Sequence, residues 1–215
     1  VSSDGGRLTE WTLHYRGEKS LVEAGELGPR GLVLGRPGAG SEVVFLSLSQ
    51  EVVRLDARKP EGELVMTGED PYGIRVKQTA RFRADDYTVD VTLRLENSRA
   101  TAQTVEVALP WTAPIKPGNG KVVWPTELVW HPEGSTHREL ISKAASLETA
   151  PGEWAGLGSL YYLSALVPRS PGLKLALGKT GEGKVEAALR EAVTLAPGQA
   201  WEGRVQVYAG PKEYA

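Results

Sequence analysis

The sequence predicts an all-β fold, an antiparallel sandwich with at most one or two short helices. Hydrophobic and polar residues alternate over many short stretches, which is the pattern of half-buried strands. The 25 glycines and 14 prolines among the 215 residues separate these stretches at short intervals, as turns do in sandwiches and barrels. A helical period is nearly absent from the chain.

Length and composition bound the answer further. A chain of 215 residues can form one β domain with a sizeable core, so we predict a single domain over residues 1–215. A formal net charge of −2 argues against nucleic acid as a partner and against a polybasic membrane anchor. The absence of cysteine excludes disulfides and thiolate metal sites.

The longest nearly apolar run, Leu160 to Pro168, is far shorter than the ~20 residues that a transmembrane helix needs. No signal peptide is visible, and the chain begins with Val1 rather than methionine. We interpret it as a soluble domain excised from a longer protein.

The first seventy residues are predicted to hold several short strands. Arg16 to Ser20 is expected to be a turn and Leu21 to Gly31 a loop, because Gly28-Pro29 breaks any regular element. Arg36 to Gly40 is expected to be a plain loop, since it lacks the Gly-Lys-Ser/Thr ending of a phosphate-binding loop. The strand candidates are Leu8 to Tyr15, Leu32 to Leu34, Glu42 to Leu48, Glu51 to Leu55 and Leu64 to Gly68.

The clearest element is the hairpin that follows. Its apolar residues alternate with polar ones, so that one face of each strand points inward; these are Ile74, Val76, Ala80 and Phe82, then Tyr87, Val89, Val91, Leu93 and Leu95. A four-residue turn from Ala84 to Tyr87 puts Arg81 opposite Asp90 and Arg75 opposite Glu96. A two-residue turn puts like charges opposite each other. We predict the four-residue turn, because opposite charges across strands stabilise a sheet and like charges destabilise it.

Beyond the hairpin, Thr104 to Leu109 is expected to pair back and complete a three-stranded meander. Pro110 to Gly120 is expected to be loop, because Pro110, Pro114 and Pro117 bar a central strand. Arg138 to Ala145 fits a short helix with a capping box, or an extended segment, equally well. The remaining strand candidates are Lys121 to Trp130, Trp154 to Leu157, Leu160 to Val167, Leu173 to Leu177, Val185 to Leu195 and Trp201 to Ala209.

The end of the chain carries the most specific pattern. Ala196 to Gln199 is predicted to be a turn, since Pro197 presets one backbone angle and Gly198 accepts a positive φ. The alternating strand from Trp201 to Ala209 follows, and Gly210-Pro211 is expected to end it because proline cannot donate to a ladder.

This ending resembles the close of the large periplasmic domain of the YidC membrane protein insertase family. The resemblance rests on an LxPG turn followed by Y-x-GPKEY, matched here by Leu195, Pro197, Gly198, Tyr208, Gly210, Pro211, Lys212, Glu213 and Tyr214. The family's W-x-G and Y-F-x-x-A-x-x-P segments resemble Trp154 to Leu157 and Tyr161 to Pro168. The close resemblance covers about a third of the chain.

The resemblance implies a β-supersandwich similar to galactose mutarotase, at the periplasmic face of the bacterial inner membrane, with transmembrane helices before and after it. It implies a non-catalytic module of an insertase and chaperone for inner-membrane proteins. The implied partners are the insertase core in cis, the Sec translocon with SecD and SecF, and nascent membrane proteins. No catalytic residue, cofactor or metal is implied. Lys212, Glu213 and Tyr214 are the candidate interaction or hinge residues.

Other chemistry has weak support in the sequence. Trp111, Trp124 and Trp130 cluster in the irregular middle section, where they either fill the core or line an apolar groove. The alternative function is a carbohydrate-binding or aldose-epimerase-like domain, which needs a histidine acid and a glutamate base in one cleft. The candidate pairs are His131 or His137 with Glu186 or Glu191, although no spacing supports them. A third alternative is a generic adhesion or scaffold module. The carboxylate pairs Glu69-Asp70 and Asp85-Asp86 are interpreted as turn residues.

Overall fold

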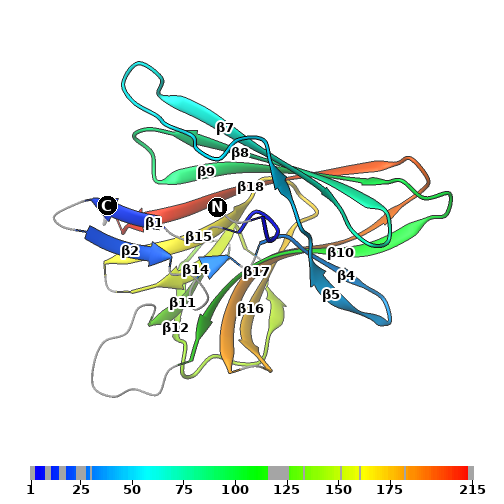
Figure 1. Cartoon of the computed structure of the whole chain (residues 1–215). Coiled ribbons are helices and arrows are strands. Elements are labelled where there is room, and N and C mark those ends of the chain that lie inside the picture. The colour runs from blue at the N-terminus through cyan, green and yellow to red at the C-terminus, as the bar shows by residue number, and fades with distance from the viewer. Residues whose placement is uncertain are drawn as a thin grey trace.

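The computed structural model describes residues 3–7, 11–14, 18–22, 28–29, 31–115, 126–132, 134–150, 152–159, 161–181 and 183–212. Two antiparallel sheets pack against each other, with a separate two-stranded ribbon beside them (Figure 1). The described residues contain no helix, so the all-β prediction is confirmed. The segment 138–145 is extended at first: β12 covers His137–Leu140 and a turn follows.

Nine strands form the larger sheet. In spatial order they are β12, β11 (Glu127–His131), β14 (Trp154–Gly158), β15 (Tyr162–Pro168), β18 (Ala200–Pro211), β9 (Thr88–Asn97), β8 (Ile74–Arg83), β7 (Glu61–Glu69) and β6 (Ser47–Leu48). The smaller sheet has the order β13 (Glu148–Ala150), β16 (Lys174–Thr180), β17 (Lys184–Leu195), β10 (Gln103–Pro114), β4 (Val33–Arg36) and β5 (Ala39–Val43), and β3 (Gly28–Pro29) also pairs with β10. The ribbon consists of β1 (Trp11–His14) and β2 (Glu18–Val22).

The hairpin of β8 and β9 has the predicted register. Arg81 lies opposite Asp90 and Arg75 opposite Glu96, and residues 84–87 form the connection. The Asp86 carboxylate accepts a hydrogen bond from the Thr88 amide at 2.9 Å, which confirms its role as a turn residue. Arg83, rather than Arg81, forms the ion pair with Asp90, and the hydrogen bond that Arg83 donates to the Asp90 carboxylate raises the pKa of Arg83.

The expected three-stranded meander is wrong, because β10 does not return along β9. It enters the smaller sheet and pairs along its whole length with β17, while β18 takes the place beside β9. The link from β9 to β10 and the link from β17 to β18 therefore cross between the sheets together, at the right of Figure 1.

Asn97 joins these two links. It is fully buried, and its side-chain amide donates to the carbonyls of Thr101, at 2.8 Å, and Leu195, at 3.0 Å. Its backbone exchanges hydrogen bonds with Gln199 and Gly198. One asparagine thus satisfies carbonyl groups from both crossing links, in a place where water has no access.

We predict that Asn97→Ala lowers the free energy of unfolding by about 1–3 kcal/mol, because it leaves buried carbonyls without a donor. Urea-induced unfolding of the purified chain measures this effect. The matched control is Gln103→Ala, which removes a hydrogen bond from an exposed part of the same link and is expected to change the free energy by under about 0.5 kcal/mol. Equal effects of the two substitutions would contradict the structural role of Asn97.

Proline also misled two predictions. Pro110 and Pro114 lie inside the long strand β10, not in a loop. On the side away from β17, the described partners of β10 pair with Glu106–Ala108 and with Trp111–Thr112. Pro110 falls between them, where the strand needs no donor on that side. Similarly β18 continues through Pro211, which pairs with Tyr162 while the adjacent Lys212 amide donates to the Tyr161 carbonyl.

Near the N-terminus the predictions were partly wrong. β2 occupies part of the expected turn and loop, whereas residues 51–55 form no strand. The latter segment instead packs over the larger sheet, since a Cβ at Gly62 would lie 2.5 Å from a Val53 methyl group and 2.7 Å from a Leu55 methyl group. Its apolar residues alternate like those of a strand because one side of the segment covers a sheet. Alternation alone does not distinguish such a covering segment from a strand that pairs within a sheet.

Candidate interaction site

A buried ion pair joins the two sheets, between strands that lie next to their edge strands. Arg36, at the end of β4 in the smaller sheet, bonds to the Asp70 carboxylate just after β7 in the larger sheet. The two side chains are only 9% and 6% exposed. Because an unpaired charge is costly to bury, this contact holds the two edges in a fixed relation.

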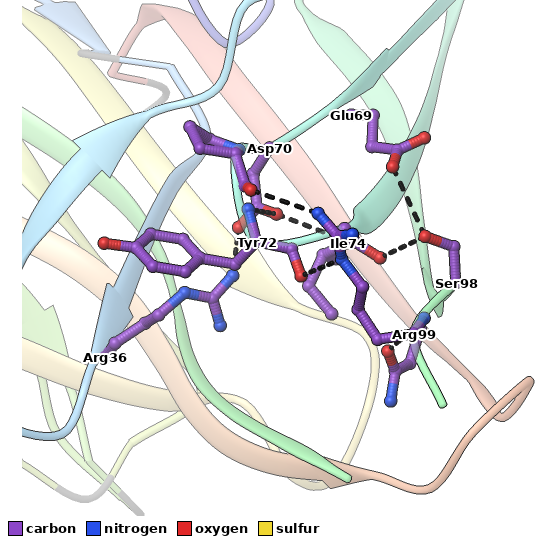
Figure 2. Close-up of polar contacts among 10 residues, drawn as sticks. Arg36, Glu69, Asp70, Tyr72, Ile74, Ser98 and Arg99 are labelled. Carbon is purple, nitrogen blue, oxygen red and sulfur yellow. Dashed lines mark hydrogen bonds and ion pairs between the residues drawn. The ribbon is translucent and has the colours of Figure 1, made fainter. Parts of the chain in front are cut away.

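Asp70 also organises the turn from β7 to β8. Its other carboxylate oxygen accepts hydrogen bonds from the backbone amides of Tyr72, at 3.0 Å, and Ile74, at 2.8 Å. Arg99 closes the turn from the far side by donating to the carbonyls of Tyr72 and Pro71, at 3.2 and 3.3 Å (Figure 2). The interpretation of Asp70 as a turn residue is confirmed, and its ion pair adds a second role.

Tyr72 is presented at the surface by this rigid turn. Its ring lies over the Arg36 guanidinium, with the central carbon 4.3 Å from the ring centre, as Figure 2 shows. Beside it opens a cavity of about 330 Å³, which lies between β4, β5 and the β7–β8 turn. Leu34 and Val44 line its buried part, and Val43, Phe45 and Tyr72 line its exposed part.

Lys212, a candidate hinge residue, is held firmly. Its ammonium group donates to the Glu127 carboxylate and to the Ser159 carbonyl, both at 2.5 Å, and its side chain is 8% exposed. Since Glu127 belongs to β11 and Ser159 follows β14, this one side chain reaches from the end of β18 past two intervening strands to β11. Glu213 and Tyr214 lie outside the described residues.

Gly158 leaves the space for this contact. A Cβ at Gly158 would lie 3.1 Å from the Glu127 carboxylate and 3.2 Å from the Lys212 nitrogen. The geometry makes Lys212 an anchor for the end of β18, and its role as an interaction or hinge residue stays a prediction.

We predict that Lys212→Met lowers the free energy of unfolding by about 2 kcal/mol, because it leaves the Glu127 carboxylate without its charged donor. Chemical denaturation of the purified chain measures the loss. Lys77→Met, at an exposed position of β8, serves as the control and is expected to change stability by no more than about 0.5 kcal/mol. A Lys212→Met variant as stable as this control would show that the anchor is dispensable.

The three tryptophans proposed for an apolar groove are not alike. Trp111 lies in β10, is fully buried and packs in the core. Trp130 lies in β11, half-buried, with its ring stacked on His137 at 5.3 Å between centres. Trp124 lies outside the described residues. The groove stays a prediction, and within the described chain Trp111 has the surroundings of a core residue.

The histidines and glutamates proposed for acid–base work lie in different sheets. His131 and His137 belong to β11 and β12, and they contact Thr136 and Ser135, at 3.0 and 3.3 Å. Glu186 and Glu191 belong to β17 in the smaller sheet. Glu186 accepts a hydrogen bond from Arg190 at 2.7 Å, and Glu191 accepts one from the Trp201 indole at 3.1 Å.

A polar cavity of about 490 Å³ lies over the smaller sheet. Charged residues of both signs surround it, and they are Glu106, Glu148, Lys174, Arg190 and Glu191. Arg190 also pairs with Glu106 at 3.3 Å. Neither histidine of the acid–base hypothesis lines this cavity.

Two further findings concern the described residues as a whole. They contain no group of three or more histidine, aspartate or glutamate residues placed to hold a metal ion. No helix long and apolar enough to span a membrane occurs among them.

Sequence reasoning missed Arg36 and treated Asp70 only as a turn residue. The two are 34 positions apart, and each sits in a Gly- and Pro-rich turn that accounts for it locally. The only signal was an arginine at the end of an apolar strand, which is too common to indicate a buried pair.

The comparison with protein families matches residues 25–215 to the YidC periplasmic domain. Among curated proteins, the membrane protein insertase YidC of Oleidesulfovibrio alaskensis is 23% identical over 96% of this chain and 40% of its own length. That of Nitrosococcus oceani is 22% identical over 77% of this chain and 33% of its own length. The chain thus spans less than half the length of these relatives.

Solved structures confirm the fold. A galactose mutarotase-like protein from Lactobacillus casei matches with a TM-score of 0.57 at 10% identity, over 98% of this chain and 96% of its own. A TPR-domain containing protein from Parabacteroides distasonis matches with a TM-score of 0.63 at 11% identity, over 99% of this chain and 45% of its own. At such low identity the likeness shows a shared supersandwich and nothing about function.

Proposed function

Because the chain belongs to the YidC periplasmic domain family, we propose that it is a non-catalytic periplasmic module of a membrane protein insertase. In this proposal it stands at the outer face of the bacterial inner membrane, covalently joined to the insertase core. It assists the insertion and folding of inner-membrane proteins, with the Sec translocon and SecD/SecF or without them. Its own contribution is docking, contact with client proteins or spacing.

The family match over residues 25–215 carries the proposal. The anchoring of Lys212 supports it, because the end of β18 is fixed to β11 and β14. Whatever follows the strand then leaves the sandwich from a defined point. An attached membrane core would therefore be oriented by the domain.

Complementation of cells depleted of their insertase tests the proposal. The full-length gene is compared with a version that lacks residues 1–205 of this chain, and immunoblotting of membranes controls for the amount of protein. If cells grow with either version of the gene, the domain is an accessory module. If they grow only with the full-length gene, the domain takes a direct part in insertion. If the intact gene fails to complement although its product is present in the membrane, the insertase function is contradicted.

A carbohydrate-binding or aldose-epimerase-like domain is the second candidate, and the polar cavity over the smaller sheet favours it. Mixed carboxylate and cationic groups suit the hydroxyl groups of a sugar. The separate placement of the histidines and glutamates argues against epimerase chemistry. Titration with galactose, followed by nuclear magnetic resonance of the chain, is expected to show no shift changes around Arg190. Shift changes there that disappear in Glu191→Gln would favour this second function.

A further inference from the structure

One continuous stretch of chain forms an edge of both sheets. Residues 39–52, here called the edge segment, contain β5 at the end of the smaller sheet and β6 at the end of the larger one. Among the described residues, the strand β5 pairs only with β4, and the strand β6 pairs only with β7. Between them, Phe45 forms a bridge with Asp4, and the backbones of Val44 and Leu46 bond to residues 3–5 and Leu32. The free edge is therefore that of β5. A strand that pairs on one side presents unused amide and carbonyl groups to any chain that can lie beside it.

Most of the large apolar side chains that are exposed in the described part of the chain belong to this segment. Seven large hydrophobic side chains are exposed in the described part, and four of them belong to the edge segment: Val43, Phe45, Leu48 and Val52. A fifth, Tyr72, lines the same cavity as Phe45. Phe45 is 66% exposed. Val43, Phe45 and Tyr72 line this cavity, whereas Leu48 and Val52 line another one. Exposed apolar side chains gathered around one cavity are typical of an interaction surface.

The cavity gives the surface a charge preference. Its charged lining residues are Arg36 and the three carboxylates of Glu42, Glu69 and Asp70, which gives a formal charge of +1 − 3 = −2. The buried pair with Asp70 takes up the charge of Arg36. The Glu69 carboxylate forms an ion pair with Arg75 at 3.5 Å. Glu42 forms no ion pair with another described residue. A cationic group therefore complements the cavity and an anionic group does not.

The site is also rigid before anything binds. The Arg36–Asp70 pair and the hydrogen bonds from Arg99 fix the turn that carries Tyr72. Gly73 has a φ of +83°, and a Cβ there would lie 2.3 Å from the Arg99 side chain. A fixed wall loses little conformational entropy on binding, which favours affinity.

We propose that the edge segment binds an extended polypeptide in which a lysine or arginine stands beside large apolar residues. The polypeptide adds as a strand to β5, its apolar side chains contact Phe45 and Tyr72, and its cationic side chain lies near Glu42. This inference goes beyond the proposed function, because strand addition to the domain does not depend on an insertase activity.

Fluorescence anisotropy of the purified chain tests the proposal with a labelled synthetic peptide in which valine and phenylalanine alternate with lysine and threonine. A second peptide carries glutamate in place of lysine. The wild-type chain is expected to bind the lysine peptide at least about tenfold more tightly than the glutamate peptide. Equal affinity for the two peptides, or no binding of the lysine peptide up to about 1 mM, would overturn the proposal.

Variants with matched controls locate the binding site. Phe45→Ser and Glu42→Lys are each expected to weaken binding of the lysine peptide about tenfold. The controls are Tyr161→Ser, at a tyrosine that is 65% exposed on another part of the surface, and Glu153→Lys, at an exposed glutamate before β14. Both controls are expected to bind within about twofold of wild type, and a loss in them as large as in the edge variants would place the site elsewhere.

Analytical ultracentrifugation of the chain without peptide measures its oligomeric state. It tests whether a second copy of the chain, instead of a foreign polypeptide, occupies the edge segment. A wild-type dimer that becomes monomeric in Phe45→Ser would show that the edge pairs with itself, and the proposal would be wrong. A wild-type monomer supports a foreign polypeptide as the occupant. Neither result changes the outcome of the complementation experiment, so the two proposals fail independently.

Discussion

Arg36→Ala is expected to lower the free energy of unfolding by about 3–5 kcal/mol, because it leaves the Asp70 carboxylate buried without its cation. Asp70 is 6% exposed at its side chain and also accepts the two backbone hydrogen bonds that shape the β7–β8 turn. A loss of this size is a large part of the stability of a typical domain. Urea or guanidinium denaturation followed by tryptophan fluorescence measures it.

The control for this prediction is Arg81→Ala. Arg81 forms an ion pair with Glu63 at 3.6 Å, but its side chain is 58% exposed, and exposed pairs contribute no more than about 1 kcal/mol. The double variant Arg36→Met, Asp70→Asn removes both charges and is expected to recover part of the loss. If Arg36→Ala is no less stable than Arg81→Ala, the ion pair does not hold the sheet edges together.

Trp111→Ala is expected to lower the free energy of unfolding by about 3–5 kcal/mol, because it opens a large cavity in the core. Trp111 is fully buried in β10, where it pairs with Ala187 on one side and with Pro29 on the other. Its indole nitrogen finds no hydrogen-bond partner within the described part of the chain. Trp111→Phe, which keeps most of the ring and removes this N–H, is expected to cost much less.

The Trp111→Ala variant also tests the apolar groove that we inferred from the sequence. Trp130→Ala is the comparison, since Trp130 is half-buried and stacks on His137; its loss is expected to cost about 1 kcal/mol. Thermal melting of both variants measures the difference. A Trp111→Ala variant with unchanged melting temperature would mean that the tryptophan is not a core residue, and the groove would gain support.

The two proposed contact regions of the domain have different physical characters. The Lys212 anchor is a buried polar contact that fixes the end of β18, so it suits a geometric role toward a covalently attached core. The edge segment is an exposed apolar surface beside an acidic cavity, so it suits a partner that binds and leaves. Removing the Lys212 anchor is expected to change the stability of the domain. Removing exposed side chains of the edge segment is expected to change binding alone.

The sequence alone determined the elements whose evidence is local. The register of the β8–β9 hairpin followed from charges that face each other across two adjacent strands, and the structure has Arg81 opposite Asp90 and Arg75 opposite Glu96. The all-β class followed from alternation and turn residues. The family was indicated by the residues from Leu195 to Tyr214, because a short fixed motif after a strand is specific.

Only the tertiary structure decided which strands far apart in the sequence are neighbours. Alternation in β10 shows that the strand has two different faces, but it contains no information about its partner, and β10 pairs with β17 rather than with β9. The same limit hid the Arg36–Asp70 pair, whose members meet only because the edges of two sheets approach each other. Sequence patterns report which side of a segment is buried, whereas pairing between distant segments depends on the packing of the whole chain.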